Sequence, residues 1–331
     1  MGSFYAIEVL EKAIEDVKEL LFPFKATDWL KMILVVLLVG GFSFSMNIPG
    51  DIFEIGENIQ HQVEAEGGAQ IADTAFTGMM SAGELLQFNI GLLLFMLILL
   101  ASLVSTLWIV AGNIMEFVFV KICADREIKI LNNFSGNIVN GLRLLGFNIL
   151  VMLVFGIIIG VPFIMYLLLG IRNIPFFVFY AVLGILLFLI VNLVSMFTTD
   201  FVIVRMLEQK KGIWRSWEEV FNLLNNEWKQ TSIYILFRII ITIGTSIIGA
   251  IIFLVLMIPV LLIAGLFVLI TVSVYNSMAT PGIVIGLVFG VIIVLLVLFL
   301  SLTIRVPLMT FVRYYSIRVF EKFANNEIIV N

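Results

Sequence analysis

The sequence predicts an all-α polytopic membrane helix bundle, with about six transmembrane helices paired as three hairpins and amphipathic helices on the cytoplasmic side. Hydrophobic residues make up 62% of the 331 residues and charged residues 13%, whereas soluble domains are about 45–50% apolar and about 25% charged. The apolar residues gather in uncharged runs such as 90–110, 177–194 and 283–300. Each run is near the roughly 20 residues that cross a bilayer core as a helix. The runs lack the alternation of barrel strands, so helices must satisfy the backbone in lipid.

The distribution of charge predicts the topology. Lys and Arg near the ends of spans mark the cytoplasmic side of a membrane. The segment 47–87 contains no Lys or Arg and carries several Asp and Glu residues, so we expect an outer loop there. Basic residues gather around 121–143, 205–229 and 313–322, which places these segments inside. The charge distribution therefore predicts a multi-pass protein of the cell membrane with both termini cytoplasmic. The expected spans are 29–46, 88–120, 145–171, 175–205, 232–274 and 283–308.

The fifth run, 232–274, is too long for one straight crossing. As a single helix it would measure about 64 Å, roughly twice the thickness of a bilayer core. Pro259 lies within it and must kink or break a helix. Two full crossings would place the basic C-terminal tail outside. The sequence therefore leaves two alternatives, a kinked single helix or a partly re-entrant one.

Short sequence echoes predict an internal repeat within a single integral membrane domain, 1–331. A Phe-Val pair lies at or just past the cytoplasmic end of each returning span, at Phe117-Val118, Phe201-Val202 and Phe311-Val312. We therefore divide the chain into three pseudo-repeats. Their boundaries are about 1–124, 125–212 and 213–331.

Two segments have the three- and four-residue apolar spacing of amphipathic helices. The first carries Phe4, Ile7, Leu10, Ile14, Val17 and Leu21, and the second carries Trp217, Val220, Phe221, Leu224 and Trp228. The polar face of the first is acidic, which anionic lipid would repel. We expect structural collars that pack across the cytoplasmic mouth of the bundle, with lipid sensing as the alternative.

Charged residues near the cytoplasmic ends of the spans form the candidate site. They are Glu116, Asp200, Arg205, Arg238 and Arg305. An ionisable group in a span costs about 2.5–3.5 kcal/mol at the centre on insertion scales, so each needs a partner or a role. One interpretation is inter-helix ion pairs, in which Arg238 and Arg305 pair with the two acids. The other is a polar cavity open to the cytoplasm, lined by these groups with Asn113, Asn192 and Thr199.

Glycines at four-residue spacing predict close helix packing. Gly282, Gly286 and Gly290 form a ridge on the last span, and Gly156 and Gly160 repeat the spacing on the third. Small residues let helices approach closely where the hydrophobic effect does not drive association. The spacing indicates packing and leaves open whether the neighbour is internal or another subunit.

The sequence offers little for catalysis. It contains one cysteine and one histidine, which argues against a histidine metal site or a histidine-based catalytic pair. We find no phosphate loop, dinucleotide-binding glycine pattern, zinc spacing or nucleophile elbow. No basic patch interleaved with aromatic residues indicates nucleic acid. We therefore expect no enzyme activity, cofactor or metal.

Two segments carry a family resemblance. They are Asp200-Phe201-Val202-Ile203-Val204 leading to Trp217 and Phe221, and the ending Val306-Pro307-Leu308-Met309-Thr310-Phe311-Val312-Arg313-Tyr314-Tyr315. The chain, over roughly 125–331, resembles uncharacterised multi-span proteins of archaea and bacteria related to the membrane domain associated with glycerophosphodiester phosphodiesterases. In that family the catalytic part is a separate soluble barrel rich in His, Glu and Asp. The resemblance therefore implies a membrane module without the phosphodiesterase activity.

These observations favour a non-enzymatic membrane module that acts as an anchor, a scaffold or a subunit of a membrane assembly. Its partners would be membrane lipids and either another protein or a second copy of the chain. The alternative is a small transporter or a lipid- or amphiphile-handling protein with a cytoplasm-facing polar cavity. The repeat, the prolines and the polar groups near the cytoplasmic mouth motivate that alternative.

Overall fold

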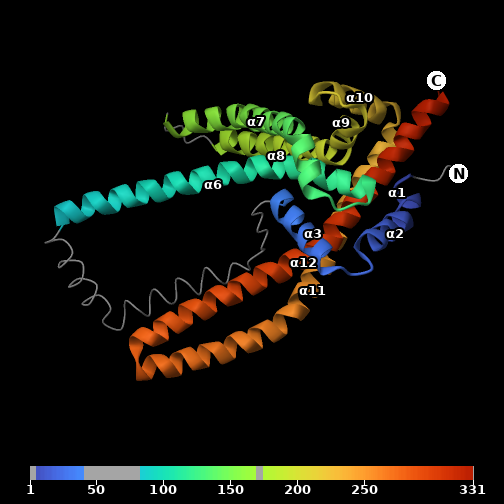
Figure 1. The fold of residues 1–331 in the computed structure, drawn as a ribbon. Helices are drawn as coiled ribbons and strands as arrows, with labels where there is room; N and C mark the ends of the chain where they lie inside the picture. Colours follow the sequence, from blue (N-terminus) through green and yellow to red (C-terminus); the bar gives the residue numbers. More distant parts are fainter. Residues whose placement is uncertain (1–4, 41–82, 169–173, 331) are drawn as a thin grey trace. The chain divides into compact units, whose positions relative to one another are not determined.

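A computed structural model describes residues 5–40, 83–168 and 174–330 of the chain (Figure 1). These residues form helices joined by short turns, with no strand in the described ranges. The prediction of an all-α protein is confirmed. Most of the predicted outer loop, 47–87, lies outside the described residues, as does the predicted turn near 172.

Three helices open the chain: α1 (Tyr5–Glu8), α2 (Leu10–Leu21) and α3 (Ala26–Val39). The helix α2 is amphipathic as predicted, and part of the expected stripe is buried. Leu21 is buried and Val17 packs against the core, whereas Ile14 is 41% exposed. Ala13 and Asp16, which lie outside the expected stripe, are also buried.

Two long helices form a hairpin in the middle of the chain. The helix α6 (Gly83–Asp125) precedes it, α7 (Ile130–Leu168) contains Pro162, and α8 (Ile174–Phe197) returns beside α7. A π-helical turn, η1 (Thr198–Val202), leads into α9 (Ile203–Gln209). The amphipathic helix α10 (Ile213–Asn226) follows and buries Ile213, Ser216, Val220, Leu223 and Leu224.

The last hairpin joins the two longest helices, α11 (Trp228–Ser277) and α12 (Ala279–Val330), which lie side by side (Figure 1). The 50 residues of α11 would span about 75 Å at 1.5 Å per residue. The helix continues through Pro259 without a break. Of the two alternatives for the fifth run, the structure has one continuous helix whose ends extend beyond a bilayer core.

Five helices are long and apolar enough to cross a membrane. Their apolar stretches are 95–125, 130–164, 178–209, 228–275 and 281–324. The chain is thus a multi-pass membrane protein. The first of the six predicted spans, 29–46, is described only through residue 40, and the 14-residue helix α3 covers it from residue 29 to Val39. Four residues of α3 are buried: Met32, Ile33, Val35 and Val36.

The described chain divides into two compact units. One comprises residues 1–39 and 111–331, and the other comprises residues 40–110. The first unit contains the hydrophobic core, which gathers one end of each long helix with α2, α3 and α10. The most apolar parts of the spans are not in this core, because only 0–11% of their residues are buried. In the second unit, the described side chains from 95 to 107 are exposed.

Candidate functional site

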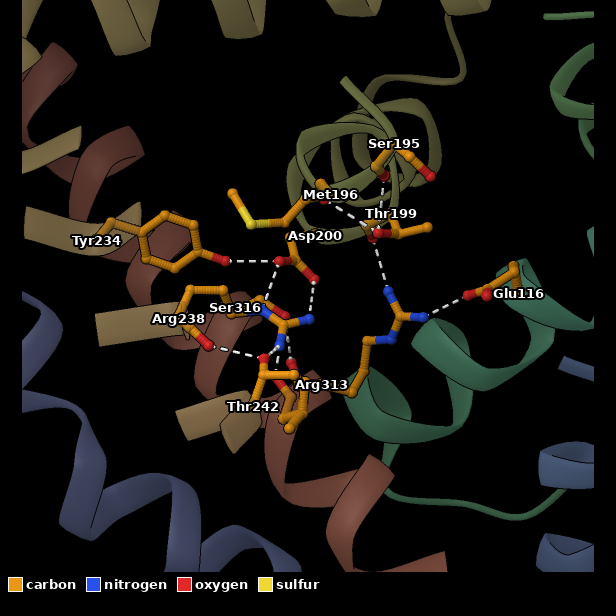
Figure 2. Close-up of polar contacts among 11 residues, drawn as sticks. Glu116, Ser195, Met196, Thr199, Asp200, Tyr234, Arg238, Thr242, Arg313 and Ser316 are labelled. Carbon is orange, nitrogen blue, oxygen red and sulfur yellow. Dashed lines mark hydrogen bonds and ion pairs between the residues drawn. The ribbon is translucent and has the colours of Figure 1, made fainter. Parts of the chain in front are cut away.

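A buried carboxylate lies at the centre of the core. Asp200 belongs to the π-helical turn η1 and is 2% exposed. Tyr234 donates its hydroxyl hydrogen to Asp200 Oδ2 over 2.7 Å. Arg238 donates from Nε to the same oxygen over 2.8 Å and from Nη2 to Oδ1 over 3.2 Å (Figure 2). Both partners come from α11, four residues apart, so they lie on the same face of the helix, one turn from each other.

The guanidinium of Arg238 is fixed on both sides. Its Nη1 donates to the Thr242 hydroxyl over 2.9 Å, and Thr242 donates in turn to the Arg238 carbonyl oxygen over 2.7 Å. A bidentate pair of this kind is stronger and more directional than a single charged hydrogen bond. The arrangement therefore holds η1 against α11 in one geometry.

A second ion pair, with a hydrogen bond beside it, connects α6, η1 and α12. Arg313 of α12 is 7% exposed and donates from Nη2 to Glu116 of α6. Its Nη1 donates to the backbone carbonyl oxygen of Thr199 over 2.6 Å (Figure 2). The guanidinium carbon also lies 5.4 Å from the centre of the Phe119 ring, a cation–π distance. One arginine thus connects α6, η1 and α12.

The π-helical turn brings the two pairs together. Ile203 donates its N–H to the carbonyl oxygen of Thr198, five residues back, so the turn is wider than an α-turn. The hydroxyls of Thr198 and Thr199 donate to carbonyls of the preceding turn. Such single π-turns are frequent at functional sites. Here the turn offers the Asp200 carboxylate to α11 and the Thr199 carbonyl to α12.

The three sequence echoes of the proposed repeat meet at this site. Glu116 and Asp200 stand immediately before the Phe-Val pairs of the first two echoes, and Arg313 follows the third. Each of the first two echoes supplies an acid. The last third of the chain supplies both arginines, Arg238 and Arg313.

Two further ionic clusters surround the core. Glu219 of α10 accepts from Arg205 of α9 over 2.9 Å and from Lys211. Burial acts to raise the pKa of Glu219, but hydrogen bonds from Lys211 and Arg205 outweigh it, so the pKa lies below its ordinary value. The effect is to hold α10 against α9 through a carboxylate that stays ionised.

The other cluster fixes the N-terminal helix. Asp16 of α2 accepts from Arg318 of α12 over 2.7 and 3.0 Å and from Arg126. Arg126 lies just past α6 with a φ of 55°, in the left-handed conformation common at helix ends. Lys322 also reaches Glu8 over 3.1 Å. The first helices are therefore attached to α12 by charge as well as by apolar contact.

The predicted site residues separate into distinct pairs. Asp200 and Arg238 are partners, as the ion-pair interpretation expects. Glu116 pairs with Arg313, which was not among the predicted partners. Arg305 is half-buried on α12, about two turns before Arg313. Arg205 contacts Glu219 and Glu208, which lie outside the predicted group.

The amides and hydroxyl predicted to line a cavity make hydrogen bonds within the chain. Asn113 accepts from the Asn148 amide over 2.9 Å, which ties α6 to α7. The Asn192 amide donates to the Phe188 carbonyl over 2.8 Å. The Thr199 hydroxyl donates to Ser195 and Met196 carbonyls.

The predicted packing glycines have different surroundings. A Cβ at Gly282 would lie 2.5 Å from Tyr275 Cα, and one at Gly286 would lie 2.9 Å from Thr271 Cγ2. These two glycines thus pack within the α11–α12 hairpin, so their neighbour is internal. At Gly156, Gly160 and Gly290, a Cβ would meet no described atom within 4 Å.

Sequence reasoning missed Arg313, Tyr234 and Asp16. Arg313 follows the last expected span by only a few residues, so it was taken for part of a cytoplasmic tail. Asp16 was assigned to the polar face of α2, although it lies three residues after Ala13 and seven after Val9, on the face that is buried. The helical spacing of Asp16 from Val9 and Ala13 could therefore have predicted that Asp16 is buried.

Comparison with known proteins places the chain in a family without assigning it an activity. No curated protein and no solved structure matches it. A family model described as a family of unknown function, DUF7544, matches residues 4–326. The match covers nearly the whole chain, including all the ion pairs described above, and the protein belongs to this family.

Proposed function

We propose that this chain is a non-enzymatic membrane scaffold, a subunit whose packed core holds its hairpins together while their apolar surfaces receive lipids and other membrane helices. The observation that carries the proposal is the low burial of the spans, in which 0–11% of the most apolar residues are covered by the chain itself. A self-contained bundle would cover one face of each span. In this reading, the uncovered faces are assembly surfaces.

The state of the buried charges supports a scaffold over a transporter. A transporter or amphiphile-handling protein with a cytoplasm-facing polar cavity needs polar groups that are available to a ligand. The Asp200 carboxylate is engaged by Arg238 and Tyr234, and that of Glu116 by Arg313. Such pairs join helices and leave little binding capacity for a substrate.

The location and wider relationship are part of the proposal. The charge distribution favours the cell membrane, with the packed core and both termini on the cytoplasmic side. The resemblance to the membrane domain associated with glycerophosphodiester phosphodiesterases would then reflect a shared anchoring or assembly role, not a shared reaction. A protein partner and a second copy of the chain are both compatible occupants.

One stretch of α12 suits a partner helix. A shallow hollow of about 390 Å³ lies over Leu287, Gly290, Val291, Val294 and Leu295, all from this one helix. Gly290 lies one turn beyond Gly286, at a position where a Cβ would meet no described atom within 4 Å. Small residues at this spacing permit close approach of another helix in lipid.

The test uses a photo-crosslinking amino acid at Val291, which is 51% exposed. We expect a discrete cross-linked protein species in the membrane, either a second copy or a stoichiometric partner. Gly290→Leu should abolish it, because the larger side chain prevents close approach of another helix, whereas a Cβ at this position would meet no described atom of the chain within 4 Å. The matched control is Gly160→Leu, which has the same open surroundings on a different hairpin.

The two functional readings give different outcomes. Cross-links to lipid alone, unchanged in the Gly290→Leu variant, would contradict the scaffold. They would favour the lipid-handling alternative. Thermal stability in detergent should be the same for both leucine variants, so a change in cross-linking reports on association.

A further inference from the structure

A groove of about 350 Å³ lies between α8, the amphipathic helix α10 and the start of α11. Its lining includes apolar side chains, among them Ile190 and Leu193 of α8 and Phe221 of α10. It also includes Trp217 and the amide side chain of Asn225. The lining therefore combines hydrocarbon with polar groups.

Trp217, which lines the groove, is held in place by contacts with the core. The Trp217 indole N–H donates to the Thr198 hydroxyl over 3.2 Å. Its ring stacks on Phe147 of α7, with centroids 6.1 Å apart and planes 28° from parallel. Thr198 begins the π-helical turn that carries Asp200. The groove is thus attached to the same packed core as the buried ion pairs.

The groove lies where the surface of the chain changes from apolar to polar. On α8 the exposed large apolar side chains end at Leu193, and on α11 they begin after Trp228 with Leu236. Between them, Ser232 lines the groove. Trp228 of the lining and Trp214 of α10 are each 63% exposed. Tryptophans are enriched at the head-group level of a bilayer, so the groove opens at that level.

A positive charge lies beside one of the lining residues. The Lys229 ammonium is 5.8 Å from the centre of the Trp228 ring, and that ring lines the groove. Lys229 is exposed. The Asn225 amide, which is also in the lining, can donate hydrogen bonds. An ammonium and an amide donor next to an apolar lining complement a phosphate attached to an acyl chain.

From this arrangement we infer that the groove binds an anionic phospholipid of the leaflet nearest the packed core. The acyl chain lies along α8, between Leu193 and Phe221, and the phosphate lies at Lys229 and Asn225. This site is separate from the buried ion pairs and from the glycine surface of α12. The inference goes beyond the scaffold role and does not depend on it.

The first test measures contact between lipid bromine atoms and tryptophan. Two variants each retain one of the five tryptophans, Trp217 in the groove or Trp214 outside its lining, and have phenylalanine at the other four. Each is titrated in detergent micelles with phosphatidylglycerol or phosphatidylcholine carrying dibrominated acyl chains. We expect saturable quenching of Trp217 at a lower mole fraction of phosphatidylglycerol, and a gradual, unsaturated response of Trp214. Lys229→Gln should raise the phosphatidylglycerol requirement about fivefold.

The second test keeps all tryptophans and therefore does not depend on the folding of the single-tryptophan variants. Native mass spectrometry of the full chain with added phosphatidylglycerol should show one retained lipid. Leu193→Trp should remove it by filling the groove. Leu189→Trp is the control, because Leu189 is also exposed on α8 but is not in the lining.

Several outcomes would overturn the inference. Equal quenching of Trp217 and Trp214 would indicate only bulk contact with the micelle. Equal retention of the lipid by the two Leu→Trp variants would place it elsewhere. Protection of Trp217 from both brominated lipids, together with a second copy of the chain in the complex, would assign the groove to a partner helix.

Discussion

Replacing Asp200 by asparagine tests whether the buried pair holds the core together. The substitution keeps the shape of the side chain, and the amide oxygen can still accept from Tyr234. It removes the negative charge that Arg238 contacts through two nitrogen atoms. The guanidinium side chain, 15% exposed, would then keep its charge without its carboxylate partner.

The expected loss of stability is large for one substitution. Removing one member of a buried ion pair costs about 3–5 kcal/mol, mainly because the other charge stays buried and uncompensated. Asp200 is 2% exposed and its pair is bidentate, so we expect Asp200→Asn to lie in this range. Adding Arg238→Met removes the stranded charge. The double variant should therefore be more stable than the sum of the single losses predicts, with a coupling of about 2 kcal/mol.

The assay is reversible unfolding from mild micelles by sodium dodecyl sulfate, followed through tryptophan fluorescence. Asp28→Asn is the control, because Asp28 forms an exposed pair with Lys31 over 3.3 Å, and such pairs contribute about 1 kcal/mol or less. The reasoning fails if Asp200→Asn is no more costly than this control, or if the two single losses simply add. A folded but inactive Asp200→Asn protein would instead favour the polar-cavity alternative.

Three other features give predictions of their own. Glu219→Gln should destabilise the chain by about 1–3 kcal/mol at neutral pH; because folding lowers the Glu219 pKa, the wild-type advantage should shrink in denaturation curves as pH falls below about 4.3. Gly141→Leu should destabilise by at least about 1–3 kcal/mol, since even a Cβ there would lie 2.7 Å from the Ile114 Cα. Gly146→Leu should lower the thermal midpoint much less, because a Cβ at Gly146 would meet no described atom within 4 Å. Asp16→Asn should release α2, and limited proteolysis should then cleave the first 25 residues faster.

The helices could be predicted from the sequence because lipid leaves few alternatives. A long uncharged run must satisfy its backbone internally, so hydropathy alone identifies 178–209 or 281–324 as helical. The ends of the helices were harder to place. α12 continues to Val330, well past the predicted end of the span at 308, because its later turns pack in the core through Tyr315 and Phe320.

The partners within the site could be predicted only in part. The free-energy cost of placing a charge in a span indicates which charged residues need partners, and it correctly indicates Asp200 and Arg238. Geometry decides which partner each receives. Arg305 and Arg313 lie on the same helix about two turns apart, and only the positions of α6 and η1 select Arg313 for Glu116. Those positions depend on the π-helical turn, which the residue pattern of η1 does not predict.

Contacts between apolar spans in lipid do not specify a unique arrangement of helices, and this explains where the packed core lies. Leucine-rich surfaces gain no hydrophobic energy by contacting each other there, so two hairpins can change partners at small cost. A paired charge is different, because leaving it without its partner is expensive. In this chain the pairs Asp200–Arg238, Glu116–Arg313 and Asp16–Arg318 each join segments far apart in sequence. All three lie at the core end of the helices, where ionic contacts can set a unique arrangement. If the chain is the scaffold proposed above, its exposed spans would be the surfaces that receive neighbouring helices.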